Sequence, residues 1–392
     1  MSTLPPEARA RVDAAVAALR GGRPAEARRL FEQFIAAGGA DASVQLGLAY
    51  ACLGMNDTAA AAAAADRVLA SEPRNLRALV LRGDCLQRSG DTRAAMAYYQ
   101  AAVQAAPPAE QLPAEVAREV ARARAMCQRQ TAELEQALRQ RLAAGGLDVA
   151  AAGRFAESLD ILFGHRRIYF QQPSKYFFPG LPQIQFYKRG AFPWLDAVEA
   201  ATDDIREELL QVMHVPDAFA PYVQAAPGRP RQQGNVMLDN PDWSAFYLWK
   251  EGVVVAENAA RCPRTMAALA GVPLNQLPNR SPSVMFSLLR PHARIPPHNG
   301  LINTRLICHL PLIVPPGCGF RVGNENRHWQ EGKAWVFDDS IEHEAWNPSD
   351  QTRVILLFEI WRPELTEQER LLVQALFAAI DAQSGQKPAW EI

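Results

Sequence analysis

The sequence contains no long apolar run. About 20 consecutive apolar residues are needed to cross a bilayer, whereas the alanine-rich run at 58–65 is short and is bounded by Asp57 and Asp66. The first residues also lack the apolar core of a secretory signal. We therefore expect a cytoplasmic protein that has no membrane partner.

An excess of charge is lacking as well. The 41 Lys and Arg residues nearly balance the 42 Asp and Glu residues, which leaves a formal net charge of −1. Neither a nucleic acid nor an anionic membrane surface is therefore expected as a partner. The six cysteines show no CxxC pair and no regular spacing, which favours a reducing compartment in which they serve as small apolar residues.

The composition of the first third of the sequence indicates helices. With 392 residues, of which 48% are hydrophobic, the chain is long enough for two or three domains. Residues 8–110 are rich in Ala, Leu and Arg and poor in β-branched residues, a composition that favours helix. Pro73 and Pro107 close two similar segments and lie 34 residues apart. The turn residues Asp57 and Asp91 keep the same spacing.

This period, with Gly in the first helix and small residues in the second, resembles the tetratricopeptide repeat. A weaker unit precedes it at 10–39. We expect stacked helix hairpins over 1–112, because a single hairpin cannot bury its apolar face alone. The repeats either offer a concave surface to a peptide or protein or serve only as a packing module. One long helix over 113–146, ended by Gly145 and Gly146, should follow them.

The remaining residues, 147–392, form a domain of a different kind. Pro and aromatic residues become frequent, and turn signals separate six short segments of strand-like sequence, which indicates an antiparallel sandwich or barrel. The expected strands are 283–289, 303–314, 319–322, 333–337, 343–347 and 352–361. A final helix should begin at Thr366, which forms a capping-box pattern with Glu369. Its apolar residues should pack on the barrel: Leu371, Leu372, Leu376, Phe377 and Ile380.

Five of the seven histidines fall between residues 292 and 343. In the strand expected at 303–314, side chains alternate between faces, so Arg305, Ile307 and His309 share one face. A cation and an imidazole on that face indicate a polar cavity. Arg353, on the last expected strand, needs an anionic partner if it points into the barrel. An internal carboxylate or a bound carboxylate ligand would each serve, and Arg grips a carboxylate with two parallel hydrogen bonds.

Pro296 and Pro297 predict a turn on which His298 lies, and His343 follows 45 residues later. A barrel can bring such distant positions together, and two imidazoles facing open coordination positions suit Fe(II). The usual iron site adds a carboxylate two residues after the first histidine, but that position is Gly300. Asp339 is four residues before His343 and is expected to orient the site rather than to bind the metal.

These segments closely resemble the aspartyl/asparaginyl β-hydroxylase family, in which H-x-G replaces H-x-D. The resemblance covers roughly 165–370. It is carried by HNG at 298–300, TRLICHL at 304–310, GCGFRVGNENRHWQEGKAWVFDDSIEHEAWN at 317–347, RVILLFEIWRPELT at 353–366, DWS at 242–244 and FPGL at 178–181. It implies an α+β multidomain chain in which an N-terminal all-α, tetratricopeptide-like domain precedes a double-stranded β-helix (jelly-roll or cupin-like) catalytic domain.

The resemblance also implies the roles of individual residues and the cofactors. His298 and His343 would bind Fe(II), with water in place of the carboxylate ligand. Arg353 would hold the distal carboxylate of the cosubstrate 2-oxoglutarate, and O2 would be the second cosubstrate. Ser287 and His309 would complete the hold on this carboxylate, and Trp243 matches a tryptophan of the family's cofactor-binding pocket.

The resemblance implies hydroxylation of the β-carbon of an Asp- or Asn-type residue in a peptide, a protein or a carrier-bound amino acid. Two alternatives remain open at this point. A halogenase is conceivable because Gly300 leaves a coordination position for chloride, and a non-catalytic binding module could retain the barrel. One residue departs from the family pattern: relatives that act on proteins often carry Arg where this chain has Ile307, so this end of the pocket is less polar.

Overall fold

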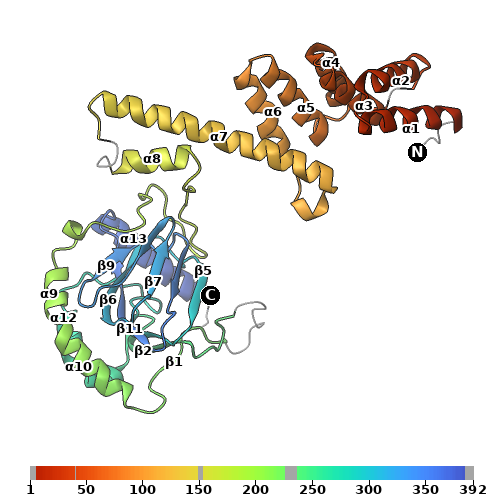
Figure 1. Cartoon of the computed structure of the whole chain (residues 1–392). Helices are drawn as coiled ribbons and strands as arrows, with labels where there is room; N and C mark the ends of the chain where they lie inside the picture. The colour runs from red at the N-terminus through yellow and green to blue at the C-terminus, as the bar shows by residue number, and fades with distance from the viewer. Residues whose placement is uncertain (1–5, 40, 149–152, 226–235, 385–392) are drawn as a thin grey trace. The chain divides into compact units, whose positions relative to one another are not determined.

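The computed structural model describes residues 6–39, 41–148, 153–225 and 236–384, which form two compact units, Met1–Phe163 and Gly164–Ile392. The first unit is entirely helical (Figure 1). Its helices are α1 Pro6–Arg20, α2 Pro24–Ala36, α3 Ala42–Gly54, α4 Thr58–Ser71, α5 Leu76–Arg88, α6 Thr92–Ala105, the 3-10 turn η1 Ala109–Gln111, α7 Ala114–Ala144 and α8 Arg154–Leu162. The expected helical repeats and the long helix after them are confirmed.

The repeat signals have local physical causes. Asp57 and Asp91 cap α4 and α6, because their carboxylates accept hydrogen bonds from Ala60 N and Ala94 N, each at 3.0 Å. Glycine lets the paired helices approach closely. A Cβ built on Gly83 would lie 2.5 Å from the ring of Tyr99, and one on Gly47 would lie 2.3 Å from a ring of the neighbouring helix.

The boundary between the units differs from the expected one. We placed it between 146 and 147, whereas the structure divides the chain between Phe163 and Gly164. Helix α8 therefore belongs to the helical unit. An ion pair of 3.3 Å between Arg139 of α7 and Asp160 of α8 helps to hold the two helices together.

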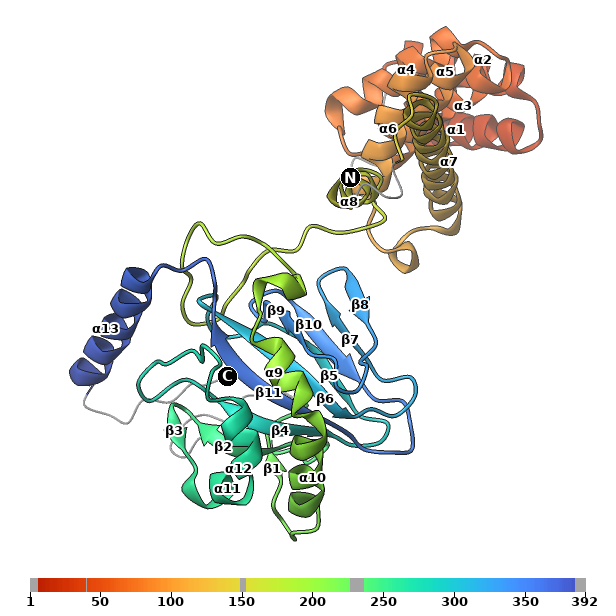
Figure 2. The ribbon, with the colours of Figure 1, turned by 90° about the vertical axis from the view of Figure 1, so that its left-hand side faces the viewer.

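The second unit contains two antiparallel sheets (Figure 2). The seven-stranded sheet has the order β1-β2-β4-β11-β6-β9, with β3 paired to β2, and the four-stranded sheet has the order β5-β10-β7-β8. The strands are β1 Ala220–Pro221, β2 Trp243–Lys250, β3 Val253–Val254, β4 Val284–Leu289, β5 Arg294–His298, β6 Arg305–Ile313, β7 Gly319–Val322, β8 Glu325–Arg327, β9 Trp335–Phe337, β10 His343–Trp346 and β11 Arg353–Trp361. This two-sheet architecture is the jelly-roll class expected from the sequence.

Two apolar clusters show which elements pack against each face of the large sheet. Helices α9 Leu195–Ala200, α10 Thr202–Met213 and α12 Pro263–Ala268 pack with even-numbered residues of β6 and β11, such as Leu310 and Leu356, on its outer face (Figure 1). Odd-numbered residues such as Ile307 and Ile355 face the other way and pack with residues of the small sheet, such as Phe320. The predicted site residues Ser287, His309 and Arg353 are odd-numbered and belong to this inner face.

Two expectations about this unit were wrong. The sequence predicts a turn at Pro296 and Pro297, but the two prolines lie within β5. This strand is at the edge of its sheet, where proline is tolerated because one row of N–H groups is unpaired. The final helix, α13 Glu367–Ser384, forms with the expected Thr366 and Glu369 capping box. Of its apolar residues, Val373 and Phe377 are buried, whereas the following are 40–61% exposed: Leu371, Leu372, Leu376 and Ile380.

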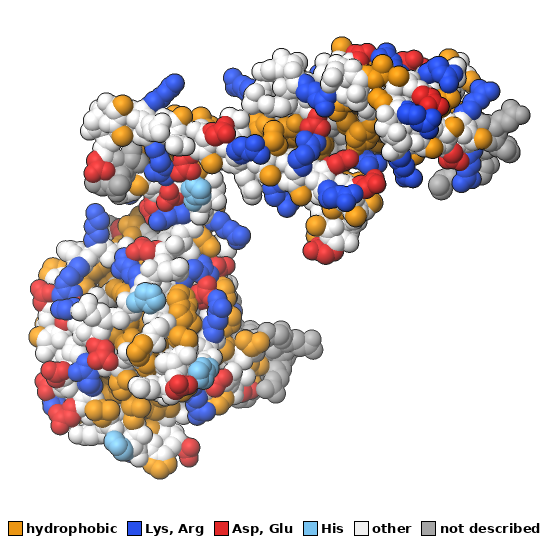
Figure 3. All heavy atoms as spheres, viewed as in Figure 1, with side chains coloured by type: hydrophobic (Ala, Val, Ile, Leu, Met, Phe, Trp, Pro, Cys, Tyr) orange, Lys and Arg blue, Asp and Glu red, His pale blue; other side chains and the backbone are white. Residues whose placement is uncertain are grey.

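The surface agrees with the balanced charge of the sequence. On the face shown in Figure 3, Lys and Arg side chains are interspersed with Asp and Glu side chains. None of the helices in the part of the chain that the structure describes is long and apolar enough to cross a membrane.

The close approach at Gly83 generates a test. Gly83→Ala should stabilise the helix by about 1 kcal/mol, because Ala has the higher helix propensity. Its methyl group would, however, overlap the Tyr99 ring, and overpacking typically lowers the free energy of unfolding by about 1–3 kcal/mol. We expect the clash to dominate and the helical unit to unfold at a lower temperature, followed by far-UV circular dichroism. Arg93→Ala, at an exposed position of α6, is the control and should leave the unfolding temperature nearly unchanged. A raised unfolding temperature for Gly83→Ala would contradict this packing.

Candidate active site

Two histidines lie side by side where strand β5 pairs with strand β10. His298 ends β5 and His343 begins β10, and the register places the two residues directly opposite each other. Their ring centroids lie 4.1 Å apart. Strand pairing therefore brings together two imidazoles that are 45 residues apart in the sequence.

Both rings are oriented by the backbone. The Nδ1 atom of His298 lies 2.8 Å from the carbonyl oxygen of Pro296, and that of His343 lies 3.0 Å from the carbonyl oxygen of Ile341. A carbonyl only accepts, so each Nδ1 donates and each Nε2 keeps its lone pair. Burial lowers the pKa of both histidines, which favours the neutral form that binds metals.

A carboxylate occupies the space beside Gly300. A Cβ built on Gly300 would lie 2.2 Å from Oδ2 of Asp339, so this position has no room for a side chain. The backbone N–H of Gly300 donates to the carbonyl oxygen of Asp339 at 2.6 Å. The space that a side chain at position 300 would take is therefore filled by the carboxylate of Asp339, which also forms an ion pair of 3.0 Å with Arg305.

Arg353 is a buried cation that has no counter-ion among the residues that the structure describes. Its side chain is 1% exposed, its NH1 donates to the carbonyl oxygen of Ser287 at 3.2 Å, and its guanidinium lies 4.8 Å from the ring centre of Trp329. Among the described residues, no carboxylate pairs with it and its Nε has no partner. Burial lowers the pKa of Arg353 to about 10, so the group stays charged at neutral pH.

The remaining predicted residues surround these groups. His309 is 4% exposed, and burial together with the charge of Arg353 lowers its pKa well below the usual range. Its Nδ1 has no hydrogen-bond partner among the residues described. Nε1 of Trp243 donates to Oγ of Ser287 at 3.1 Å, and the indole lies 6.0 Å from the ring of His298. The six predicted residues thus lie on the inner faces of the two sheets.

The sequence analysis missed several neighbours. Tyr222 stacks on Trp243 with ring centroids 4.1 Å apart, but it follows a two-residue strand that gives no periodic signal. Phe320 and Phe337 pack against both His309 and His343. Glu359, an ion-pair partner of Arg305, could have been found, because it continues the odd-numbered face of β11 on which Arg353 lies.

The side chains of the site have the chemistry needed to bind the Fe(II) and the 2-oxoglutarate expected from the sequence. Within the described ranges, no cluster of three or more His, Cys, Asp or Glu residues could hold a metal ion. The His298 and His343 pair provides two nitrogen donors and falls one ligand short of such a cluster. Arg353 and the unpartnered Nδ1 of His309 provide a cation and a polar atom that a carboxylate ligand would satisfy.

Comparisons with known proteins find similar sequences for both units of the chain. Residues 199–363 match the family profile described as aspartyl/asparaginyl beta-hydroxylase, and residues 12–54 and 53–110 match a tetratricopeptide repeat profile. The mouse aspartyl/asparaginyl beta-hydroxylase is 34% identical over 221 residues, which is 54% of this chain and 28% of the mouse protein. The ornithine lipid ester-linked acyl 2-hydroxylase of Rhizobium tropici is 34% identical over 192 residues, which is 48% of this chain and 64% of that protein.

A human relative, aspartate beta-hydroxylase domain-containing protein 2, is 30% identical over 213 residues, or 53% of this chain and 55% of the human protein. The chain thus spans less than two thirds of the length of each of these relatives. Solved structures are more distant. PcrH in complex with the chaperone-binding region of PopB has a TM-score of 0.29 at 18% identity, covering 32% of this chain and 98% of that one. A cupin domain from Bordetella pertussis has a TM-score of 0.18 at 20% identity, covering 22% of this chain and 88% of that one.

The contact between Gly300 and Asp339 can be tested by a double-mutant cycle. Gly300→Ala should lower the free energy of unfolding by about 1–3 kcal/mol, because its methyl group would overlap the Asp339 carboxylate. In an Asp339→Ala background the same change should cost clearly less. Gly271→Ala, where a Cβ meets nothing within 4 Å, is the control. An equal cost of Gly300→Ala in both backgrounds, measured by chemical denaturation, would contradict this geometry.

Proposed function

The chain joins tetratricopeptide repeats to a domain of the aspartyl/asparaginyl beta-hydroxylase family, and on this premise we propose that it is an Fe(II)- and 2-oxoglutarate-dependent hydroxylase. The proposed substrate is an Asp- or Asn-type residue of a peptide, protein or carrier-bound amino acid. The repeats are proposed to recruit a peptide or protein substrate. The protein is proposed to act in the cytoplasm.

The uncompensated charge of Arg353 is the observation that carries the proposal. A buried charge without a partner is strongly unfavourable, and Arg353 is 1% exposed without a carboxylate contact among the described residues. A dicarboxylate cosubstrate would supply the missing anion through two parallel hydrogen bonds. His309 and Ser287, on the neighbouring strands β6 and β4, would add polar contacts to the same carboxylate.

Each remaining residue would have a separate task in the reaction. His298 and His343 would hold the iron through Nε2, while Pro296 and Ile341 keep the rings in the required tautomer through Nδ1. Bound iron would supply the redox chemistry by which one atom of O2 enters a substrate C–H bond and the other enters succinate as 2-oxoglutarate loses CO2. Asp339 would accept hydrogen bonds from water that takes the place of the missing ligand.

Aromatic side chains would keep bulk water away from the reacting atoms. Phe320 and Phe337 pack on His343 with ring centroids 5.9 and 5.7 Å away, and both are at most 3% exposed. Trp243 covers His298 from the large sheet. Exclusion of water limits side reactions of an oxidising centre.

The two alternatives receive less support from the geometry. A halogenase would need chloride near Gly300, but the Asp339 carboxylate lies there and would repel an anion. A non-catalytic binding module would have no reason to retain a buried guanidinium that lacks a counter-ion. Both alternatives therefore rank below the hydroxylase.

A matched pair of arginine variants tests the cosubstrate site. Arg353→Met removes an uncompensated buried charge, so it should leave the free energy of unfolding unchanged or raise it by up to about 4 kcal/mol. It should also weaken 2-oxoglutarate binding to the metal-loaded protein by about 30-fold or more in calorimetry. Arg362→Met is the control, because Arg362 is equally buried but pairs with Asp338 at 2.9 Å. This control should destabilise the protein by about 3–5 kcal/mol. Strong destabilisation by Arg353→Met with unchanged 2-oxoglutarate binding would refute the proposed role.

Turnover tests the metal ligands and the reaction class. The protein, Fe(II), ascorbate and O2 should convert 2-oxoglutarate to succinate, and His343→Ala should abolish this conversion because only one nitrogen ligand would remain. Mass spectrometry of products formed in chloride buffer should show a gain of one oxygen atom. Undiminished conversion by His343→Ala would contradict the metal assignment, and a chlorinated product would establish the halogenase instead.

A further inference from the structure

Arg305 is enclosed by two carboxylates. Its guanidinium donates from NH2 to Asp339 at 3.0 Å and from NH1 to Glu359, and the three side chains are 4–6% exposed. One cation therefore faces two anions within the site, on the same face of β6 as His309. The cluster carries an excess of negative charge close to the pair of histidines.

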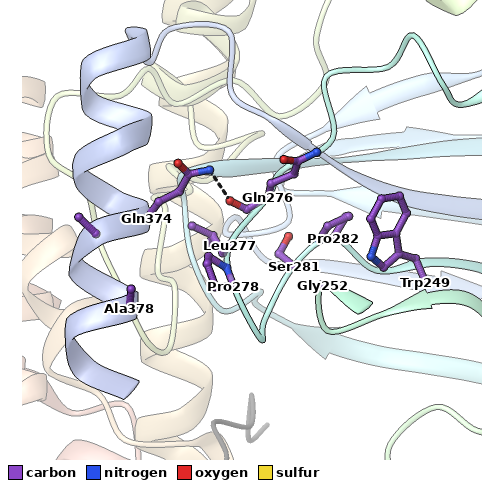
Figure 4. Close-up of a pocket in the computed structure, with 10 residues that line it drawn as sticks. Trp249, Gly252, Gln276, Leu277, Pro278, Ser281, Pro282, Gln374 and Ala378 are labelled. Carbon is purple, nitrogen blue, oxygen red and sulfur yellow. Dashed lines mark hydrogen bonds between the residues drawn. The ribbon is translucent and has the colours of Figure 1, made fainter. Parts of the chain in front are cut away.

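Hydrogen bonds from Ser281 and Ser283 fix the position of Glu359 in this cluster. Oε2 of Glu359 accepts hydrogen bonds from the hydroxyl of Ser281 at 2.6 Å and from the backbone N–H of Ser283 at 2.9 Å. Ser281 in turn lines a pocket of about 480 Å³ beside α13, which contains none of the predicted site residues (Figure 4). Arg305 could turn towards an anionic ligand only by leaving two buried carboxylates unpaired, which is costly.

Apart from Arg353, each buried cation in the described ranges already pairs with a carboxylate. Within the described part of the chain, four arginines and no lysines are buried. Arg280 pairs with Asp381, Arg362 pairs with Asp338, and Arg305 is shared as above. The fourth buried arginine is Arg353, which would pair with the carboxylate of the proposed cosubstrate. The residue between Arg305 and His309 on the inner face is Ile307, which is apolar and 5% exposed.

We infer, resting on the proposed function, that the substrate side chain hydroxylated by this enzyme is an uncharged carboxamide of a peptide, as in an asparaginyl residue, and not a carboxylate. A carboxylate would be a third anion around Arg305, and like charges brought together in a buried site repel strongly. A carboxamide carries no charge and offers both N–H donors and a C=O acceptor. Nε of Arg305 and Oδ1 of Asp339 are a donor and an acceptor in this cluster that have no partner among the described residues. A hydrocarbon chain would satisfy neither atom.

Two peptide pools that differ only in a fixed central Asn or Asp, with randomised flanking residues, test this inference. Each pool is incubated with the full chain, Fe(II), 2-oxoglutarate and ascorbate, and oxygen incorporation at the central residue is measured by mass spectrometry. We expect the rate with the Asn pool to exceed that with the Asp pool by a factor on the order of 100. Equal rates, or a faster rate with the Asp pool, overturn the inference.

A second comparison shows whether the charge around Arg305 sets this preference. Glu359→Gln removes one of the two negative charges that flank Arg305 while keeping the shape of the side chain. The ratio of the rate with the Asp pool to the rate with the Asn pool should therefore rise by about tenfold. Glu344→Gln is the matched control. Glu344 is a buried carboxylate on β10 that pairs with Arg294 and Arg321, and its loss should leave the preference unchanged. A similar shift in both variants, or no shift in Glu359→Gln with its unfolding temperature retained, contradicts the assignment.

The remaining outcomes separate this inference from the proposed function. If the protein binds 2-oxoglutarate and metal but oxidises neither pool, the carboxamide assignment fails while the cosubstrate site stands. Oxygen incorporation into the acyl chain of an ornithine lipid, with neither pool oxidised, likewise overturns the peptide assignment and identifies a lipid substrate. If the protein binds no 2-oxoglutarate, the proposed function itself fails.

Discussion

The guanidinium of Arg353 is the constraint on which the catalytic unit depends. It lies on the inner face of the large sheet with 1% of its surface exposed, and no carboxylate among the described residues neutralises it. Folding a domain around such a charge is unfavourable unless a ligand completes the site. The neighbouring His309 stays neutral because burial and the charge of Arg353 both lower its pKa. The centre of this unit thus contains a positive charge that no carboxylate of the described residues neutralises.

A second charge arrangement, formed by Arg305 and two carboxylates, lies close to the two histidines. Asp339 fills the space that a side chain at position 300 would take, and Arg305 holds it with the help of Glu359. The site therefore has one cation in excess beside His309 and one anion in excess beside Gly300. This asymmetry favours Arg353 over Arg305 as the anchor of the proposed cosubstrate, and it disfavours chloride or a second carboxylate beside Asp339.

Much of this organisation could be predicted from the sequence, because it follows from periodicity. Strand alternation placed Arg305, Ile307 and His309 on one face, and the 34-residue spacing predicted the helical repeats. Other features depend on contacts that periodicity does not encode. Proline in β5 is tolerated only because that strand lies at an edge, and the exposed leucines of α13 have the same pattern as a buried stripe. The filling of the Gly300 position by Asp339 depends on three-dimensional packing across 39 residues of chain. The sequence predicts that Arg353 needs an anionic partner, but only the structure shows that no carboxylate of the described residues provides it.

The most direct measurement is an anaerobic titration of the Fe(II)-loaded chain of 392 residues with 2-oxoglutarate, followed by visible absorption. If the histidines hold iron next to a cosubstrate anchored by Arg353, adding 2-oxoglutarate should produce a metal-to-ligand charge-transfer band that saturates at one equivalent per chain. The band should be absent when Zn(II) replaces Fe(II), because Zn(II) has no redox chemistry. Saturable binding of Fe(II) without any such band, or binding of 2-oxoglutarate that does not depend on the metal, would contradict this account of the site.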